Sequence, residues 1–256
     1  DIINEINSKI PIDKIWHLAC PAAPNYYQIN PLLTIKVNYQ GTLNIVNLAK
    51  IWGSKVLFTS TSEVYGKTEK NPQFEDMPIN LQTSSTRACY SEGKRIAETL
   101  LLASIKQHNL EIRIARIFNT YGSRISENDG RVISTFINQS LQGKKITIFG
   151  DGLQTRSFCF ISDLINGLNK LMKSKYSNPI NLGNDEEISI FDLACLIRNK
   201  INSSISFEYK DLPNDDPQYR KPSLVLAKKY LNWSPEVTLN EGLDKTISSY
   251  KDIFRC

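Results

Sequence analysis

The sequence predicts an α/β protein built on a doubly wound parallel sheet, with a smaller α/β part toward its C-terminal end. Short apolar runs alternate with stretches of helical periodicity, and no internal repeat or low-complexity linker interrupts them. The chain has 256 residues, of which 41% are hydrophobic and 22% charged, so it can bury one large core or two smaller ones. We therefore expect helices on both faces of a buried sheet.

The first half of the chain follows this alternation most clearly. The first predicted helix should end at Gly53, because glycine readily adopts the left-handed conformation that terminates helices. In the second, apolar side chains recur at helical spacing, as at Ile96, Leu100 and Ile105. The expected elements, in chain order, are a strand at 13–20, a helix at 34–53, a strand at 55–61, a helix at 91–109 and a strand at 111–119.

After residue 120 the alternation is looser. Ser189 and Asp192 form a capping box at the start of one predicted helix. Ligands of open α/β sheets bind outside the carboxyl ends of the strands, where Thr61–Glu63 and Asn119 fall. The expected elements are helices at 131–143, 162–172, 189–201, 223–232 and 239–254, and strands at 145–150, 179–183 and 205–210.

Charge and cysteine content narrow the classes of function. The net charge is +5 and the basic residues are spread out, which disfavours nucleic-acid binding and suits an anionic small molecule. We expect neither a signal peptide nor a membrane-spanning segment. Five scattered cysteines without a Cys-x-x-Cys pair predict a reducing, cytoplasmic compartment. With only His17 and His108 we expect no metal site, and we interpret His17 as a hydrogen-bonded core residue.

The strongest local signal is the pair Tyr90 and Lys94 in "YSEGK". Residues four apart share one face of a helix, so the phenol and the ammonium should point the same way. A free tyrosine has a pKa of about 10, and a nearby ammonium favours the phenolate and lowers that pKa. The pair can then remove a hydroxyl proton while a hydride leaves the carbon. Alone, Tyr-x-x-x-Lys is a weak motif that arises by chance.

Further motifs surround this pair along nearly the whole chain. They are "HLACPAAP", "NYQGTLN", "TSTSEVYG", "CYSEGKR", "RIARIFNTYG", "DGRVISTF", "FGDGLQTRSF", "SDL", "NLGN", "DDPQYRKPSL" and "LNWSP". With these motifs the sequence resembles the extended short-chain dehydrogenase/reductase family of nucleotide-sugar enzymes, and within it the UDP-glucuronate decarboxylases, or UDP-xylose synthases. "TSTSEVYG" and "YRKPS" are typical of the decarboxylases. The resemblance implies a Rossmann-like fold, NAD as cofactor and UDP-glucuronate as substrate.

The resemblance also gives a reason for the polar end of the strand at 55–61. Related 4,6-dehydratases typically carry Asp-Glu at the positions of Ser62 and Glu63, and the aspartic acid protonates a departing hydroxyl. Ser62 therefore speaks against dehydration. The 4-epimerases usually lack the glutamate, so Glu63 speaks against simple epimerisation. A lone carboxylate between hydroxyls suits proton handling at a carbon that loses carbon dioxide.

The mechanism implied by the resemblance begins with oxidation at C4 of UDP-glucuronate. Tyr90, tuned by Lys94, takes the hydroxyl proton, Thr61 hydrogen-bonds the same oxygen, and NAD⁺ takes the hydride. The 4-ketone lies β to the C5 carboxylate, so loss of carbon dioxide leaves an enolate. Arg220 and Glu63 position the carboxylate and manage protonation at C5, since a guanidinium binds a carboxylate bidentately. Return of the hydride then gives UDP-xylose.

The remaining site residues are also expectations from the resemblance. Ser62 belongs with the catalytic group. Without the resemblance, Arg220 would be interpreted as a solvated loop residue, Asn119 as a strand end and Arg156 as a surface ion-pair partner. Substrate contacts are expected from Asn119, Arg131 and Arg156. Cofactor contacts are expected from Asp1, Leu18, Ala19, Thr59, Tyr90 and Lys94.

The resemblance further implies a division into two parts and an oligomeric state. Residues 1–120, with 157–184 returning to them, would be the remainder of an NAD-binding Rossmann domain. Residues 121–156 and 185–256 would bind the substrate. A homodimer is expected through a four-helix bundle that includes the long helix at 91–109. We expect no nucleic-acid or membrane partner.

One departure from the family concerns the cofactor. The family opens with a strand and a glycine-rich turn that holds the NAD pyrophosphate, whereas the first glycine here is Gly41. About two βα units, roughly 60 residues, are missing relative to that pattern, so the chain resembles a fragment or a truncated gene product. We expect weak or absent NAD affinity for the 256 residues. Micromolar NAD⁺ binding in calorimetry would overturn this expectation.

Two alternative functions stay open at this point. The first is a sibling nucleotide-sugar 4,6-dehydratase or epimerase. The second is a catalytically inert, truncated remnant that only binds nucleotide sugars. The intact Tyr90, Lys94 and Glu63 argue against the inert remnant.

Overall fold

A four-stranded parallel sheet organises the N-terminal part of the molecule. This computed structural model describes residues 2–6, 8–68, 70–126, 129–212 and 217–254. The strand order is β1-β2-β3-β8, and every pairing is parallel. The carboxyl ends of the strands therefore lie at one edge of the sheet. The strands are β1 (Lys14–His17), β2 (Lys55–Thr61), β3 (Ile112–Ile117) and β8 (Ile180–Leu182).

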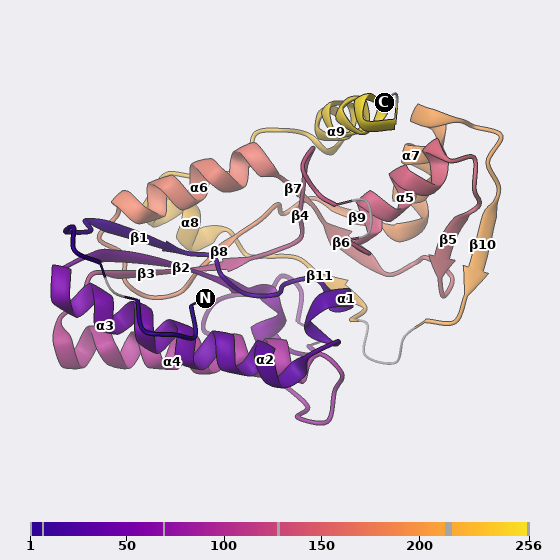
Figure 1. Cartoon of the computed structure of the whole chain (residues 1–256). Coiled ribbons are helices and arrows are strands. Elements are labelled where there is room, and N and C mark those ends of the chain that lie inside the picture. The colour runs from indigo at the N-terminus through magenta and orange to yellow at the C-terminus, as the bar shows by residue number, and fades with distance from the viewer. Residues whose placement is uncertain (1, 7, 69, 127–128, 213–216, 255–256) are drawn as a thin grey trace.

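Helices cover both faces of this sheet (Figure 1). On one face, side chains such as Ile45, Leu101 and Ile112 pack together, and on the other Leu57, Leu182 and Trp233 do so. Burial on both faces explains the apolar run at 56–58 in β2, whereas β3 alternates isoleucines with two buried arginines, Arg113 and Arg116. The predicted doubly wound α/β class is confirmed. The covering helices are α2 (Pro31–Lys36), α3 (Thr42–Trp52) and α4 (Ala88–His108) on one face, and α6 (Ile161–Lys173) and α8 (Val225–Leu231) on the other.

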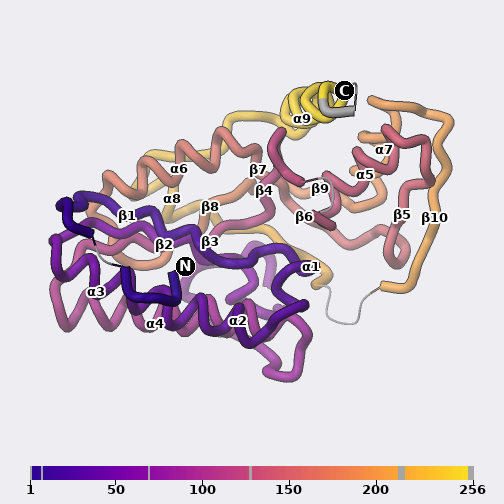
Figure 2. The backbone as a smooth tube through the Cα atoms, in the orientation of Figure 1, coloured from indigo at the N-terminus to yellow at the C-terminus, as the bar shows by residue number. Residues whose placement is uncertain are grey.

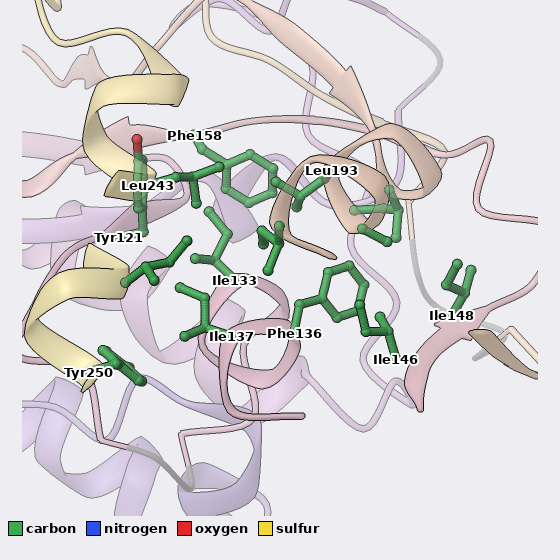
Figure 3. Packing of buried hydrophobic residues seen from close by; sticks show 14 of the residues in the cluster. Tyr121, Ile133, Phe136, Ile137, Ile146, Ile148, Phe158, Leu193, Leu243 and Tyr250 are labelled. Carbon is green, nitrogen blue, oxygen red and sulfur yellow. The ribbon is translucent and has the colours of Figure 1, made fainter. Parts of the chain in front are cut away.

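A second region has its own core. Figure 3 shows Tyr121, Phe136, Ile146, Leu193 and Tyr250 packed within it. The chain enters this region after β4, and it returns through β7 to α6 (Figure 2). The elements of the region are α5 (Val132–Leu141), α7 (Ile190–Ile201), α9 (Leu239–Phe254) and the parallel pair β5 (Ile146–Phe149) and β10 (Phe207–Lys210). The strands at the crossing are β4 (Thr120–Tyr121) and β7 (Cys159–Phe160), which pair in parallel.

A three-stranded sheet of very short strands carries two of the expected site residues. Its order is β11-β6-β9, with β11 parallel and β9 antiparallel to the central strand. In this register Arg220 pairs with Arg156, and Arg156 pairs with Ile188. The sheet therefore places two arginines from distant segments side by side. The strands are β11 (Tyr219–Arg220), β6 (Thr155–Ser157) and β9 (Glu187–Ser189).

The predicted elements occur with the predicted type, and the structure adds short ones. The helix predicted at 34–53 is interrupted by a π-helical turn, η1 (Val37–Gly41), between α2 and α3, and it ends at Gly53 with φ of 64°. α4 starts three residues before its predicted start, at Ala88. Strands of two or three residues are too short for a period to emerge. The unpredicted elements are α1 (Pro24–Tyr27), η2 (Ser62–Tyr65), β4, β6, β7, β9 and β11.

Two local predictions are confirmed. The hydroxyl of Ser189 accepts a hydrogen bond from the backbone N–H of Asp192 at 2.9 Å, which caps α7. His17 is a core residue, 3% exposed, whose Nε2 lies 3.0 Å from the hydroxyl of Thr42. Burial, and then the charge of Lys94, lowers the pKa of His17 to about 3, so the ring is neutral at physiological pH.

Three further features concern the described part of the chain alone. None of its helices combines the length and the apolar character needed to cross a membrane. Its four cysteines, Cys20, Cys89, Cys159 and Cys195, are free thiols. It contains no cluster of three or more His, Cys, Asp and Glu side chains that could hold a metal ion.

Candidate active site

A tight turn at the carboxyl end of β2 presents Glu63. The hydroxyl of Thr61 caps the turn by accepting a hydrogen bond from the backbone N–H of Glu63 at 3.2 Å. Gly66 ends the turn with φ of 69°, and a Cβ atom there would lie 1.8 Å from the carbonyl oxygen of Asn80. Only glycine fits this conformation and this space. Ser62 lies buried within the turn, so the polar stretch is built into the sheet edge and is not a solvated loop.

One carboxylate oxygen of Glu63 accepts hydrogen bonds from two arginines. Its Oε1 accepts a hydrogen bond from Nη1 of Arg220 at 2.9 Å and another from Nη1 of Arg87 at 3.0 Å. The Glu63 side chain is 15% exposed. Burial alone would raise the pKa of Glu63, but the guanidinium of Arg220, followed by that of Arg87, holds the pKa below its ordinary value. The carboxylate is therefore ionised at neutral pH.

Arg87 is a site residue that sequence reasoning missed. It lies on the N-terminal side of α4, three residues before Tyr90, and the backbone N–H of Tyr90 donates to its carbonyl. A signal for it exists in the sequence, because residues three apart share one helix face and "RACY" puts a guanidinium beside the expected phenol.

Tyr90 lies on α4, close to the turn, and is only 7% exposed. Its ring stacks on that of Tyr27 with a centroid distance of 5.0 Å and an interplanar angle of 4°. Burial raises the pKa of Tyr90 above its ordinary value, whereas the side chain of Thr61 acts in the opposite direction. The expectation that the pKa of Tyr90 is depressed is therefore wrong for the chain by itself.

The position of Lys94 explains why its charge does not offset this burial. Its Nζ donates a hydrogen bond to the backbone carbonyl of Thr59 at 2.7 Å, and it lies 4.6 Å from the centroid of the Phe58 ring. The same nitrogen is 6.0 Å from the centroid of the Tyr90 ring. Burial lowers the pKa of Lys94 itself. The two residues share a helix face as predicted, but the ammonium is directed at the backbone of β2.

Tyr27 adds a buried polar group beside Tyr90. The residue is 1% exposed, and among the described residues its hydroxyl has no hydrogen-bond partner. Burial raises the pKa of Tyr27, and the charges of Glu63, Arg87 and Arg220 act on it as well. A buried, unpaired hydroxyl beside these three charges is suited to a polar ligand.

The expected substrate residues divide into two groups. Asn119 and Arg156 lie together, because Nδ2 of Asn119 donates to the carbonyl of Ser157 at 3.4 Å, next to Arg156 on β6. The Arg156 guanidinium is buried and donates to the carbonyl of Thr155 at 2.7 Å. Arg131 lies at the start of α5, where it pairs with Asp129 and its side chain is 48% exposed, and its charge interacts with the phenol of Tyr90.

The expected cofactor residues lie at the carboxyl end of β1 and on β2. Leu18 is 54% exposed directly after β1, Ala19 follows it and is exposed, and the hydroxyl of Thr59 donates to the carbonyl of His17. An exposed apolar surface at this sheet edge, near the buried pair Tyr90 and Lys94, fits a flat nicotinamide ring. The expectation for Asp1 lies outside the described residues.

A buried ion pair between Arg116 and Glu98 is connected to the turn that carries Glu63. Arg116 on β3 binds Glu98 on α4 through two hydrogen bonds, at 3.0 Å from Nε and 2.8 Å from Nη2. Ser60 donates to the same carboxylate at 2.5 Å, and Arg116 also donates to the hydroxyl of Tyr65 at 3.2 Å. The network joins β2, β3, α4 and η2, which carry or flank the site, and it was not predicted.

Comparison with known proteins gives one family and several relatives. The model of the NAD dependent epimerase/dehydratase family matches residues 1–183. UDP-glucuronic acid decarboxylase 1 of Danio rerio is 50% identical over 241 residues, which are 94% of this chain and 58% of that protein. UDP-glucuronic acid decarboxylase 5 of Arabidopsis thaliana is 50% identical over 234 residues, which are 91% of this chain and 69% of that protein.

A solved structure of an epimerase shares the fold. UDP-glucuronic acid 4-epimerase from Bacillus cereus, in complex with UDP-glucuronic acid and NAD, superposes with a TM-score of 0.84. It is 28% identical, and the match covers 94% of this chain and 76% of that one.

Proposed function

The chain belongs to the NAD dependent epimerase/dehydratase family, and we propose that it decarboxylates UDP-glucuronate to UDP-xylose with NAD as cofactor. The observation that carries the proposal is the meeting of Arg220 and Arg87 on one oxygen of Glu63, beside Tyr90. Two guanidiniums gathered around a carboxylate suit recognition of a second carboxylate on the sugar. Relatives named UDP-glucuronic acid decarboxylase, 46 to 50% identical, give independent support.

The substrate would lie across the three-stranded sheet and the carboxyl end of β2. The fork of Arg220 would receive the sugar carboxylate, and Arg87 would keep Glu63 ionised when Arg220 is engaged by the substrate. Arg156 and Asn119, which are neighbours on the same side, would bind the sugar and the diphosphate. The unpaired hydroxyl of Tyr27 would supply a further hydrogen bond, and Arg131 is a further candidate contact.

Oxidation at C4 would depend on Tyr90. Its phenol oxygen takes the C4 hydroxyl proton, while the Thr61 side chain hydrogen-bonds at the same place. Because burial raises the pKa of Tyr90, the phenolate needs stabilisation by positive charge. Lys94, whose Nζ is 6.0 Å from the centroid of the Tyr90 ring, would supply this charge by turning from the carbonyl of Thr59 toward the phenol. Leu18, Ala19 and Thr59 would hold the nicotinamide end of NAD. When bound, NAD⁺ supplies an acceptor for the hydride from C4 and later returns it.

Loss of carbon dioxide would follow from the ketone at C4. The bond between C5 and the carboxylate carbon breaks, and its electron pair enters the enolate formed by C4, C5 and the ketone oxygen. A proton then reaches C5, under the control of Glu63 and Arg220. Ser62 stands where a dehydratase would need an acid, so the site offers no group at that position to expel a hydroxyl.

The same proposal assigns parts and partners. Residues 1–120 and 157–184 would bind the cofactor, and residues 121–156 and 185–256 would bind the substrate.

A homodimer would form through α3 and α4, which border an open apolar groove lined in part by Val46, Ile96 and Leu100. The Ile96 side chain is exposed, so Ile96→Glu should give a monomer in light scattering while the fold is retained. Free thiols support a cytoplasmic location.

Mass spectrometry of the product tests the proposed reaction. Because the chain spans 58% of the length of the Danio rerio relative, the assay uses the chain alone and the chain joined to the remaining part of that protein. With UDP-glucuronate and NAD⁺ we expect a product lighter by carbon dioxide. Loss of water would identify a dehydratase, and an unchanged mass with a new sugar would identify an epimerase. Binding of UDP-glucuronate without turnover in either form would favour an inert binding protein.

A further inference from the structure

The carboxylate of Glu187, on β9, gathers three donors from three separate segments. Its Oε1 accepts hydrogen bonds from the hydroxyl of Thr155 at 2.8 Å and from Nδ2 of Asn71 at 3.0 Å. Its Oε2 accepts from the same Asn71 nitrogen at 3.1 Å and from Nζ of Lys221 at 3.2 Å. A carboxylate offers about four acceptor positions, so this one is fully used.

Each donor adjoins a residue of the proposed site. Thr155 precedes Arg156 on β6, and Lys221 follows Arg220 on β11. Asn71 lies on the segment that continues from the turn of Glu63. Two residues further along this segment, the backbone N–H of Gln73 donates to the carbonyl of Lys221 at 2.8 Å, and the N–H of Ser223 donates to the carbonyl of Gln73 at 2.7 Å.

The strands involved are too short to fix their own positions well. β11 has two residues and β6 has three, so few backbone hydrogen bonds hold the pair in register. The Glu187 side chain is 22% exposed, and its contact with Lys221 alone would contribute little at such a site. Its value lies in tying three segments to one point.

From this arrangement we infer that Glu187 is a positioning residue: it fixes β11 against β6 and the segment after Glu63, and so sets the place of the Arg220 guanidinium. The inference rests on the proposed function, in which Arg220 receives the sugar carboxylate. Glu187 contacts none of the proposed reacting groups itself. Tyr90 and Lys94 lie on α4, which takes no part in the contacts of Glu187. Loss of these contacts should therefore affect binding of the sugar carboxylate more than the chemistry at C4.

Calorimetric titration with two ligands isolates the effect on carboxylate binding. UDP-glucuronate carries the sugar carboxylate, and UDP-xylose lacks it. In Glu187→Gln the amide nitrogen cannot accept the bond from Lys221, so Lys221 is released. We expect affinity for UDP-glucuronate to fall about tenfold, and affinity for UDP-xylose to change less than about twofold. Asp185→Asn is the matched control, because it removes a nearby surface ion pair, with Lys228 at 3.3 Å, and should change neither affinity.

A second variant separates positioning from folding. Lys221→Gln leaves Glu187 with its other partners and should show the same selective loss, to a smaller extent, with an unchanged circular dichroism spectrum. If both variants fold and bind UDP-glucuronate as the parent does, or lose both ligands equally, Glu187 is structural only and the inference is wrong. If the parent chain itself binds the two ligands equally, the proposed function fails, whatever the variants do.

Discussion

The four-stranded sheet and the three-stranded sheet contribute to the proposed site in different ways. The first is regular, with strands β2, β3 and β8 mostly buried, and it places Thr61, Tyr90 and Lys94 on one strand end and one adjacent helix. The second consists of two- and three-residue strands, and it brings Arg156 and Arg220 together from segments 64 residues apart in sequence number. In the proposed reaction, proton transfer would thus depend on local geometry, whereas carboxylate recognition would depend on tertiary pairing.

The two regions meet at Glu63. Arg87 reaches this carboxylate from α4, and Arg220 reaches it from β11, on the same oxygen. A substitution in one region should therefore affect one half of the chemistry and leave the other half largely intact. The tests below use this separation.

The largest effect is expected from Tyr90→Phe. Removing the phenol oxygen removes the group that takes the C4 proton, so kcat should fall about 10²- to 10⁴-fold. The affinity for UDP-glucuronate, measured by calorimetry, should stay within about twofold, because carboxylate recognition lies on the other sheet. Tyr26→Phe is the control, since that ring is 52% exposed, and it should be neutral. A Tyr90→Phe variant with normal kcat would remove Tyr90 from the mechanism.

A smaller effect is expected from Arg220→Gln, which should lower the affinity for UDP-glucuronate that Tyr90→Phe leaves nearly unchanged. The change leaves Glu63 with one guanidinium and removes the fork for the sugar carboxylate, so kcat/KM should fall on the order of 100-fold, or about 3 kcal/mol. Affinity for UDP-glucuronate should fall while that for UDP-xylose is retained. The surface substitution Lys228→Gln serves as control. Equal losses for both ligands would show that Arg220 does not recognise the carboxylate.

Arg87→Ala should sharpen the comparison, because it removes the contact that reaches Glu63 from the start of α4. Burial raises the pKa of Glu63 and the two arginines lower it, so loss of Arg87 moves that pKa upward. The acid limb of the pH profile of kcat/KM should shift to higher pH, with about tenfold lower activity near the limb. Arg87→Lys should restore part of the shift. An unmoved acid limb would contradict the role given to this pair.

The smallest effect concerns stability and not activity. The pKa of His17 is about 3 in the folded chain, against an ordinary value of 6.5. Between these values the unfolded chain binds a proton that the folded chain does not, so the free energy of unfolding should decrease as the pH falls, by up to about 1.4 kcal/mol per pH unit. His17→Gln should give a shallower slope in denaturant titrations. The exposed His108→Gln should keep the parent slope; a steep slope in both variants would exclude His17 as its cause.

The same contrast explains how far the sequence alone could lead. The strand at 55–61 was predicted with the bounds that β2 has, because its apolar run and the glycine before it are local signals. β6, β9 and β11 were not predicted, because each has only two or three residues and most of these are polar. Their existence depends on partners that are distant in sequence.

Within the site, the sequence predicted the residue types better than it predicted their contacts and their pKa values. Glu63 and Arg220 are 157 residues apart, and only the family resemblance suggested that they meet. Arg87 and Tyr27 were missed because their roles arise from contacts across elements. The pKa of Tyr90 was predicted in the wrong direction, because helical spacing says nothing about burial or about the carbonyl of Thr59 that receives Lys94.

The most direct test of the proposed decarboxylation is the reaction of UDP-glucuronate in heavy water. After carbon dioxide leaves, C5 takes a hydron from an exchangeable group at the site, whereas the hydrogen at C4 returns from the cofactor. We expect UDP-xylose with one deuterium at C5 and none at C4, read by nuclear magnetic resonance and mass spectrometry. A product that keeps its carboxylate, or UDP-xylose without deuterium at C5, would contradict the account.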